Sequence, residues 1–93
     1  MVSVSPGRIE GELCFATADT VLRESAQLLE TGSIDLSGVT RADSAGVALL
    51  LELRRRHGAP LPLTQIPAQL GGLIEFFNLG AILMPPQPSG SAP

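Results

Sequence analysis

Hydrophobic and polar residues alternate along the first fifteen positions of the chain, as they do in strands with one buried side. The alternation predicts strands over 2–4 and 9–15, joined by a turn at Pro6-Gly7. The side expected to face the core holds Ile9, Gly11, Leu13 and Phe15, and the opposite side holds Glu10, Glu12 and Cys14. The chain therefore opens with a hairpin whose acidic side we expect to be solvated.

A helix over 18–29 follows, because apolar residues recur there at the spacing of one helical face. Thr17 or Asp19 is the expected N-cap, and Gly32 is the expected stop. Alternation then returns over 33–39, which predicts a further strand.

A second helix begins at Asp43 or Ser44, and either side chain can act as its N-cap. At about 100° per residue, the arc that suits packing on a sheet contains Gly46, Leu49, Leu50, Leu53 and His57. Val47 and Leu51 lie outside this arc, one turn apart, so the helix has more apolar surface than a sheet covers. That surface either packs against a neighbouring helix or binds another protein.

The remainder of the chain predicts one more strand and one more helix. The strand contains Leu61, Leu63 and Ile66. Pro67 suits the first turn of the helix, and Gly80 can end it. The buried face of this helix contains Leu70, Leu73, Ile74 and Phe77. We expect a short edge strand over 82–84 and a disordered Pro- and Ser-rich tail over 85–93.

Strands that alternate with helices in this way are typical of an α/β fold. We expect one domain over 1–84, with a mixed sheet of four to five strands and the helices mainly on one face. The sheet should be parallel where a helix connects two strands.

Composition excludes several classes of function. The 93 residues include six Arg, no Lys and nine acids, for a formal net charge of −3, so nothing favours binding to nucleic acid or to an anionic bilayer. One Cys and one His cannot form a dedicated metal site, and there is no phosphate-binding GxxxxGK[ST] loop. We therefore expect no metal and no cofactor.

Nothing in the chain favours catalysis or membrane insertion. Ser44 and His57 could pair as nucleophile and base, but thirteen residues of straight helix hold them about 20 Å apart. Arg54-Arg55-Arg56 is explained by the favourable interaction of positive charges with the negative end of the helix dipole. Cys14 is explained as a small, buried apolar residue. There is no signal peptide and no apolar run as long as a membrane span, so we expect a cytoplasmic protein.

Two short motifs resemble a known family. Asp35-Leu36-Ser37 in a strand, followed by Asp43-Ser44-Ala45-Gly46 at a helix start, resembles the signature of the STAS domain, the fold of bacterial anti-sigma factor antagonists. The aliphatic run 47–53 is similar to one branch, the small MlaB-like STAS subunit of the Mla phospholipid-transport ABC system. The order of strands and helices expected above is also the one that the resemblance implies.

The resemblance implies a non-catalytic accessory subunit that binds the ABC transporter's ATPase subunit and stabilises or regulates it. The partner-binding residues would be Asp43, Ser44, Ala45, Val47, Ala48 and Leu51. Such a protein would be cytoplasmic, and peripheral to the inner membrane only through its complex. The alternative is an anti-sigma factor antagonist, switched when a partner kinase phosphorylates Ser44. A third interpretation assigns Ser44 no function and explains it as the N-cap of this helix.

Overall fold

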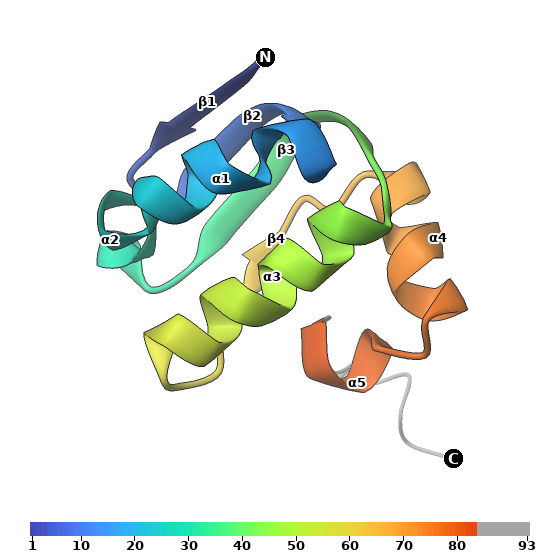
Figure 1. The fold of residues 1–93 in the computed structure, drawn as a ribbon. Coiled ribbons are helices and arrows are strands. Elements are labelled where there is room, and N and C mark those ends of the chain that lie inside the picture. The colour runs from blue at the N-terminus through green and yellow to red at the C-terminus, as the bar shows by residue number, and fades with distance from the viewer. Residues whose placement is uncertain (84–93) are drawn as a thin grey trace.

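The computed structural model describes residues 1–83 of the chain (Figure 1). Its elements, in order, are β1 (Val2–Ser5), β2 (Arg8–Leu13), α1 (Phe15–Arg23), α2 (Ser25–Leu28), a 3₁₀ turn η1 (Leu29–Thr31), β3 (Ile34–Ala42), α3 (Ser44–His57), β4 (Leu63–Thr64), α4 (Ala68–Phe76) and α5 (Gly80–Leu83). The expected order of strands and helices is thus confirmed as far as α4. The predicted domain boundary at residue 84 and the tail over 85–93 lie outside the described residues.

The strands of the described chain form one mixed sheet in the order β1-β2-β3-β4. β1 pairs antiparallel with β2, whereas β3 runs parallel to both of its neighbours. Helices make the two parallel connections, and α1 and α3 lie on the same face of the sheet (Figure 1). The α/β fold with helices on one face is therefore confirmed.

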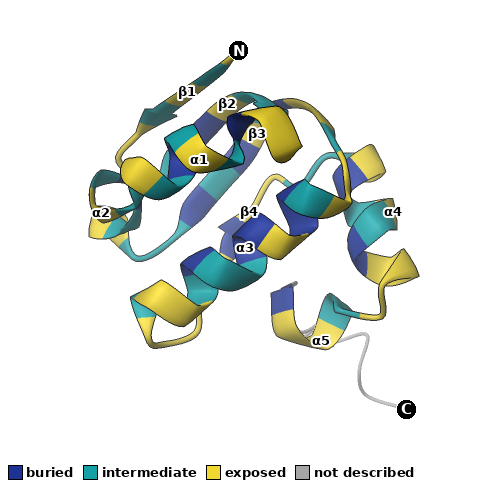
Figure 2. Ribbon diagram, in the orientation of Figure 1, coloured by how far each residue is buried: buried dark blue, intermediate teal, exposed yellow. Residues whose placement is uncertain are grey.

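The core lies between this sheet and the helices, and Figure 2 shows buried segments of β2 and β3 beneath α1 and α3. The side chains buried most completely are Ile9, Leu13, Val21, Leu28, Ile34, Leu36, Val47, Leu50, Leu53, Leu70 and Ile74. In α3, the sheet-facing arc is as predicted, since Gly46, Leu49, Leu50 and Leu53 are buried and His57 is half-buried.

The hairpin ends earlier than its alternation indicated. Phe15 begins α1 and is 82% exposed, so its predicted inward position is wrong. Cys14 is the N-cap residue, and its backbone N–H donates to the Thr17 hydroxyl at 3.1 Å. That hydroxyl also donates to the Glu12 carbonyl at 2.8 Å, which holds the first turn of α1 against the end of β2. Neither Thr17 nor Asp19 is the N-cap, because the helix has already begun.

The helix predicted over 18–29 is divided at Glu24 into α1 and α2. The Leu28 carbonyl accepts a hydrogen bond from the Gly7 N–H at 3.0 Å, so α2 is fastened to the hairpin turn. The next strand, predicted to end at residue 39, continues to Ala42 because it pairs with β2 along that length.

The short edge strand expected over 82–84 is not formed by residues 82 and 83, which are the part of this range that the structure describes. Residues 80–83 form the helical turn α5, where the Leu83 N–H donates to the Leu79 carbonyl at 2.9 Å. This turn satisfies its backbone locally and buries Leu83, so it needs no neighbour in the sheet. Gly80 begins α5 instead of ending α4, which stops at Phe76 before the left-handed Asn78.

Candidate functional site

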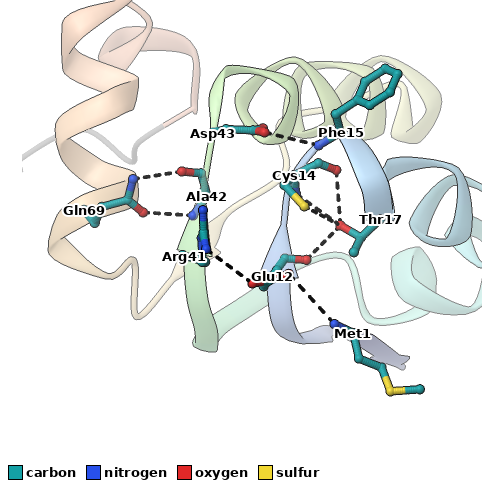
Figure 3. A network of polar contacts seen from close by, with 9 residues as sticks. All are labelled: Met1, Glu12, Cys14, Phe15, Thr17, Arg41, Ala42, Asp43 and Gln69. Carbon is teal, nitrogen blue, oxygen red and sulfur yellow. Dashed lines mark hydrogen bonds and ion pairs between the residues drawn. The ribbon is translucent and has the colours of Figure 1, made fainter.

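The start of α3 is organised by one carboxylate, that of Asp43. Its Oδ1 accepts from the Gly46 N–H at 3.0 Å. Its Oδ2 accepts from the Phe15 N–H at 3.3 Å, the contact drawn in Figure 3. Asp43 is therefore the N-cap of α3 and also binds the first residue of α1. Two helix N-termini, each with unpaired N–H groups, are joined through a single acid.

Gly46 is required by the close approach of α3 to β2. A Cβ atom at this position would overlap the carbonyl oxygen of Leu13. The same carbonyl accepts from the Asp43 N–H at 3.3 Å, so the end of β2 and the start of α3 are in direct backbone contact. The glycine of the Asp43-Ser44-Ala45-Gly46 motif thus has a packing role.

Ser44 is the first residue of α3 and is exposed. Because Asp43 is the cap, the interpretation of Ser44 as an N-cap is wrong. Within residues 1–83 its hydroxyl has no hydrogen-bond partner. The side chain is therefore free to contact a partner or to be modified without loss of a cap.

The predicted exposed strip on α3 is only partly correct. Val47 is 2% exposed, so its placement on a free surface is wrong, whereas Leu51 is half-buried and Ala48 is exposed. Val47 is buried because α4 packs beside α3, which is the neighbouring-helix alternative for this residue. Ala45 is half-buried.

A hollow of about 330 Å³ opens beside α3. Its lining residues are Ser44, Val47, Ala48, Leu51, Phe77 and Leu79, so its wall is almost wholly apolar. The structure thus brings together four of the six predicted contact residues and adds two from the segment between α4 and α5. Asp43 and Ala45 are the sequence neighbours of Ser44, but neither residue lines the hollow.

Sequence reasoning placed Phe77 in the buried face of its helix, yet it is 42% exposed at the edge of the hollow. Phe76, 79% exposed, contacts it edge to face with the ring centroids 5.2 Å apart. Two consecutive helical residues lie about 100° apart, so both rings could not have faced the core. The pair of adjacent Phe residues was the signal that could have indicated this surface.

α4 is held in place by a side chain that sequence reasoning missed. The Gln69 amide accepts from the Ala42 N–H at 2.9 Å and donates to the Ala42 carbonyl at 2.8 Å (Figure 3). At the end of β3, the Gln69 side chain thus makes the pair of backbone hydrogen bonds that a neighbouring strand would make. This pair of bonds positions α4, and with it the wall of the hollow, beside α3.

The two polar residues of the Asp35-Leu36-Ser37 motif have a structural role outside the core, whereas Leu36 is buried in it. Asp35 Oδ1 accepts from the Ser37 N–H at 2.8 Å, and Oδ2 accepts from Arg8 at 2.8 Å. The Ser37 bonds, and then Arg8, hold the pKa of Asp35 below its ordinary value. These polar groups are satisfied by one another.

The C-terminal end of α3 is also held by internal contacts. Glu52 accepts two hydrogen bonds from Arg55, at 2.9 and 2.6 Å, and one from Arg56 at 2.9 Å. These bonds, with Arg55 first, lower the pKa of Glu52 to about 2. Arg56 also donates to the Leu22 carbonyl and to the Ser25 hydroxyl, so it fastens α3 to α1 and α2. The arginines therefore do more than oppose the helix dipole.

The structure separates the one nucleophile and base considered from the sequence. Ser44 and His57 are the first and last residues of α3, so they cannot share a proton. Residues 1–83 contain no group of three His, Cys, Asp or Glu side chains placed to hold a metal ion. Cys14 is half-buried, with its Sγ 3.8 Å from the Thr17 hydroxyl. Over the same residues, every helix is too short or too polar to cross a membrane.

The family model described as "Mlab, STAS domain" matches residues 8–85, which is most of the chain. No curated protein sequence matches this chain.

Two solved structures have a similar fold. A sulfate transporter family protein from Wolinella succinogenes has a TM-score of 0.59 at 22% identity, over 87% of this chain and 75% of that one. The anti-sigma factor antagonist SpoIIAA in its unphosphorylated form has a TM-score of 0.51 at 16% identity, over 99% of this chain and 92% of that one. At such identities the similarity is one of fold.

Proposed function

The chain belongs to the MlaB-type STAS domain family, whose members are small regulatory or accessory domains that bind partner proteins, and we propose that this member is a non-catalytic subunit of an Mla-type phospholipid-transport ABC complex. It binds the ATPase subunit of that complex and stabilises or regulates it. The protein works in the cytoplasm and reaches the inner membrane only through its complex.

The observation that carries this proposal is the apolar hollow beside the first half of α3. It coincides with the surface expected to bind the partner, and one of its lining residues, Ala48, is exposed. Exposed apolar surface of this kind, next to a polar rim, marks protein contact. Asp43 and Phe15 extend the surface on the other side of Ser44, since Phe15 is exposed and its N–H binds Asp43.

Charge at Ser44 is the sharpest test of this surface. Ser44→Glu places a carboxylate at a helix N-terminus, which the helix dipole tolerates, so the fold should persist. In a desolvated contact the same charge is costly, so the ATPase subunit should no longer dock. Ser44→Ala removes only an unpaired hydroxyl and should leave docking nearly unchanged.

Each variant is coexpressed with the ATPase and permease subunits, and the copurified ATPase and the melting temperature are measured. Ser5→Glu is the matched control, because Ser5 is exposed in β1 and lies opposite Arg8. We expect loss of the ATPase with Ser44→Glu alone. Normal copurification by a folded Ser44→Glu protein would remove Ser44 from the interface, and an unmodified chain that captures no ATPase subunit would contradict the proposed function.

One observation favours the second candidate, an anti-sigma factor antagonist. The Ser44 hydroxyl is exposed and unpaired within residues 1–83, at a helix start where a phosphate meets favourable N–H groups. Phosphorylation there would leave the fold in place and block docking through up to two added negative charges. Incubation with a cognate anti-sigma kinase and ATP, followed by mass spectrometry, tests this candidate: phosphate on Ser44 would support it, and an unmodified protein would reject it.

A further inference from the structure

β1 is an edge strand that is paired on one side only. The strand order β1-β2-β3-β4 leaves its outer side without a neighbouring strand, and Figure 1 shows it as the outermost strand of the sheet. Among residues 1–83, no backbone hydrogen bond joins this outer side to a helix or a loop. A row of unpaired N–H and C=O groups is a template for a further strand.

The register between β1 and β2 identifies which groups are unpaired. The Glu12 N–H donates to the Met1 carbonyl at 3.3 Å, and the register continues from there without a shift along the whole of β1. Hydrogen-bonded and non-hydrogen-bonded pairs alternate along an antiparallel ladder, so the odd-numbered residues of β1 bond to β2. The N–H and C=O groups of Val2 and Val4 therefore point outwards.

The side chains of β1 do nothing to block pairing at this edge. Edge strands are commonly protected by charges, proline or bulges, whereas residues 2–5 are uncharged and pair with β2 without a bulge. Val2 and Val4 are half-buried against the core. Ser3 and Ser5 are exposed on the opposite side of the strand. The edge is thus neutral, with an apolar side towards the helices.

We propose that β1 pairs antiparallel with β1 of a second copy of this chain, across a two-fold axis at Ser3. Val2 of each copy then lies opposite Val4 of the other copy, and both pairs exchange two N–H···O=C hydrogen bonds. This register uses every outward backbone group of Val2 and Val4, continues the half-buried valines across the axis, and brings no charge of β1 to it. The edge is therefore complementary to itself, as a two-fold contact requires. Because β1 has only four residues, we expect a weak and reversible dimer.

This inference is independent of the proposed function. α3 packs on α1, β3 and α4, and β2 separates β1 from β3 in the sheet. The dimer therefore leaves the surface around Ser44 free in each copy. A chain that dimerises through β1 but captures no ATPase subunit would contradict the proposed function alone.

Disulfide formation tests the register of the dimer. Ser3→Cys places two thiols opposite each other in a non-hydrogen-bonded pair, whose Cα atoms lie about 4.5 Å apart, within the range of a disulfide. Ser5→Cys is the matched control, because Ser5 is exposed on the same side of β1 but lies opposite Met1 of the second copy. Both variants also carry Cys14→Ser, so that each chain has one thiol. With oxidised glutathione, intact mass spectrometry should show a disulfide-linked dimer of Ser3→Cys that forms about tenfold faster than that of Ser5→Cys.

Sedimentation equilibrium over a range of concentrations tests the backbone pairing. Val2→Pro removes half of the N–H donors from the proposed contact, and proline is tolerated at the first residue of an edge strand. The dissociation constant of the dimer should rise about tenfold. Val2→Ile is the control, because it keeps the N–H and a branched apolar side chain, and its dissociation constant should stay nearly unchanged. Melting temperatures verify that both variants are folded.

Three results would overturn the inference. The first is an unmodified chain that stays monomeric up to about 1 mM. The second is equally fast disulfide formation by Ser5→Cys and Ser3→Cys, because the register would then be wrong. The third is a dimer that Ser44→Glu dissociates and Val2→Pro does not, which would place the contact between copies on α3.

Discussion

The two ends of α3 are stabilised by different means. At the C-terminal end, Glu52, Arg55 and Arg56 satisfy one another and fasten the helix to its neighbours. At the N-terminal end, the backbone is held tightly by Asp43 and Gly46, while the side chains of Ser44 and Ala48 stay exposed. A binding surface needs a rigid backbone that presents exposed side chains without internal partners. A surface whose charges are already paired internally has few groups left for contacts with a partner.

The largest effect should distinguish the two faces of the N-terminal half. Leu50→Asp buries a charge without a partner, at a cost of several kcal/mol that is comparable to the whole stability of such a domain. Ala48→Asp changes an exposed residue and should alter stability by less than about 0.5 kcal/mol, yet it should block the partner. Urea unfolding and copurification measure both effects. Equal destabilisation by the two variants would show that Ala48 belongs to the core.

The next effect concerns the contact between α3 and β2. Gly46→Ala should cost about 3 kcal/mol, because the added methyl meets the Leu13 carbonyl, a backbone atom that cannot rotate away. Gly72→Ala in α4 is the control: nothing lies within 4 Å of its added Cβ, so it should stabilise the protein by about 0.5–1 kcal/mol. Denaturant midpoints compare the two. A neutral Gly46→Ala would mean that α3 is not anchored tightly at its start.

A smaller effect distinguishes the cap from its neighbour. Asp43→Ala removes the acceptor shared by α3 and α1 and should cost about 1–2 kcal/mol. Ser44→Ala should change stability by less than about 0.5 kcal/mol. Asp43→Asn keeps an oxygen acceptor and should recover most of the loss. If Ser44→Ala lowered the melting temperature more than Asp43→Ala does, Ser44 would be the N-cap of α3.

The smallest effect belongs to the C-terminal end and depends on pH. The pKa of Glu52 falls from 4.5 to about 2 on folding, so the folded protein holds this proton less tightly than the unfolded chain does. Its contribution to stability is complete above pH 4.5 and is lost as the pH falls towards 2. Glu52→Gln should therefore reduce the acid sensitivity of unfolding in this window. Glu75→Gln, on the exposed side of α4, is the control, and equal acid profiles for the two variants would contradict the ion-pair network.

Periodicity and motif chemistry were sufficient for most of the fold and for the location of the candidate site. The alternation in β2 and β3 and the sheet-facing arc of α3 are local patterns, and burial follows from them wherever one neighbouring sheet decides it. The same patterns gave Phe15 the wrong side, because the end of a strand depends on where the next helix begins. They also could not separate Asp43 from Ser44 as the cap, since both residue types suit that position.

The packing of α4 determines which apolar surface of α3 stays free. The helical period alone predicts that this helix has two apolar faces, because Val47 and Leu51 lie outside the sheet-facing arc. Whether the second face is covered depends on α4, whose place is set by the Gln69 bonds to Ala42, a contact between residues far apart in the chain. That placement buries Val47, leaves Leu51 in the wall of the hollow and brings Phe77 to its edge. A pattern along one helix specifies which residues share a face, but the neighbours that cover this face are fixed by long-range packing.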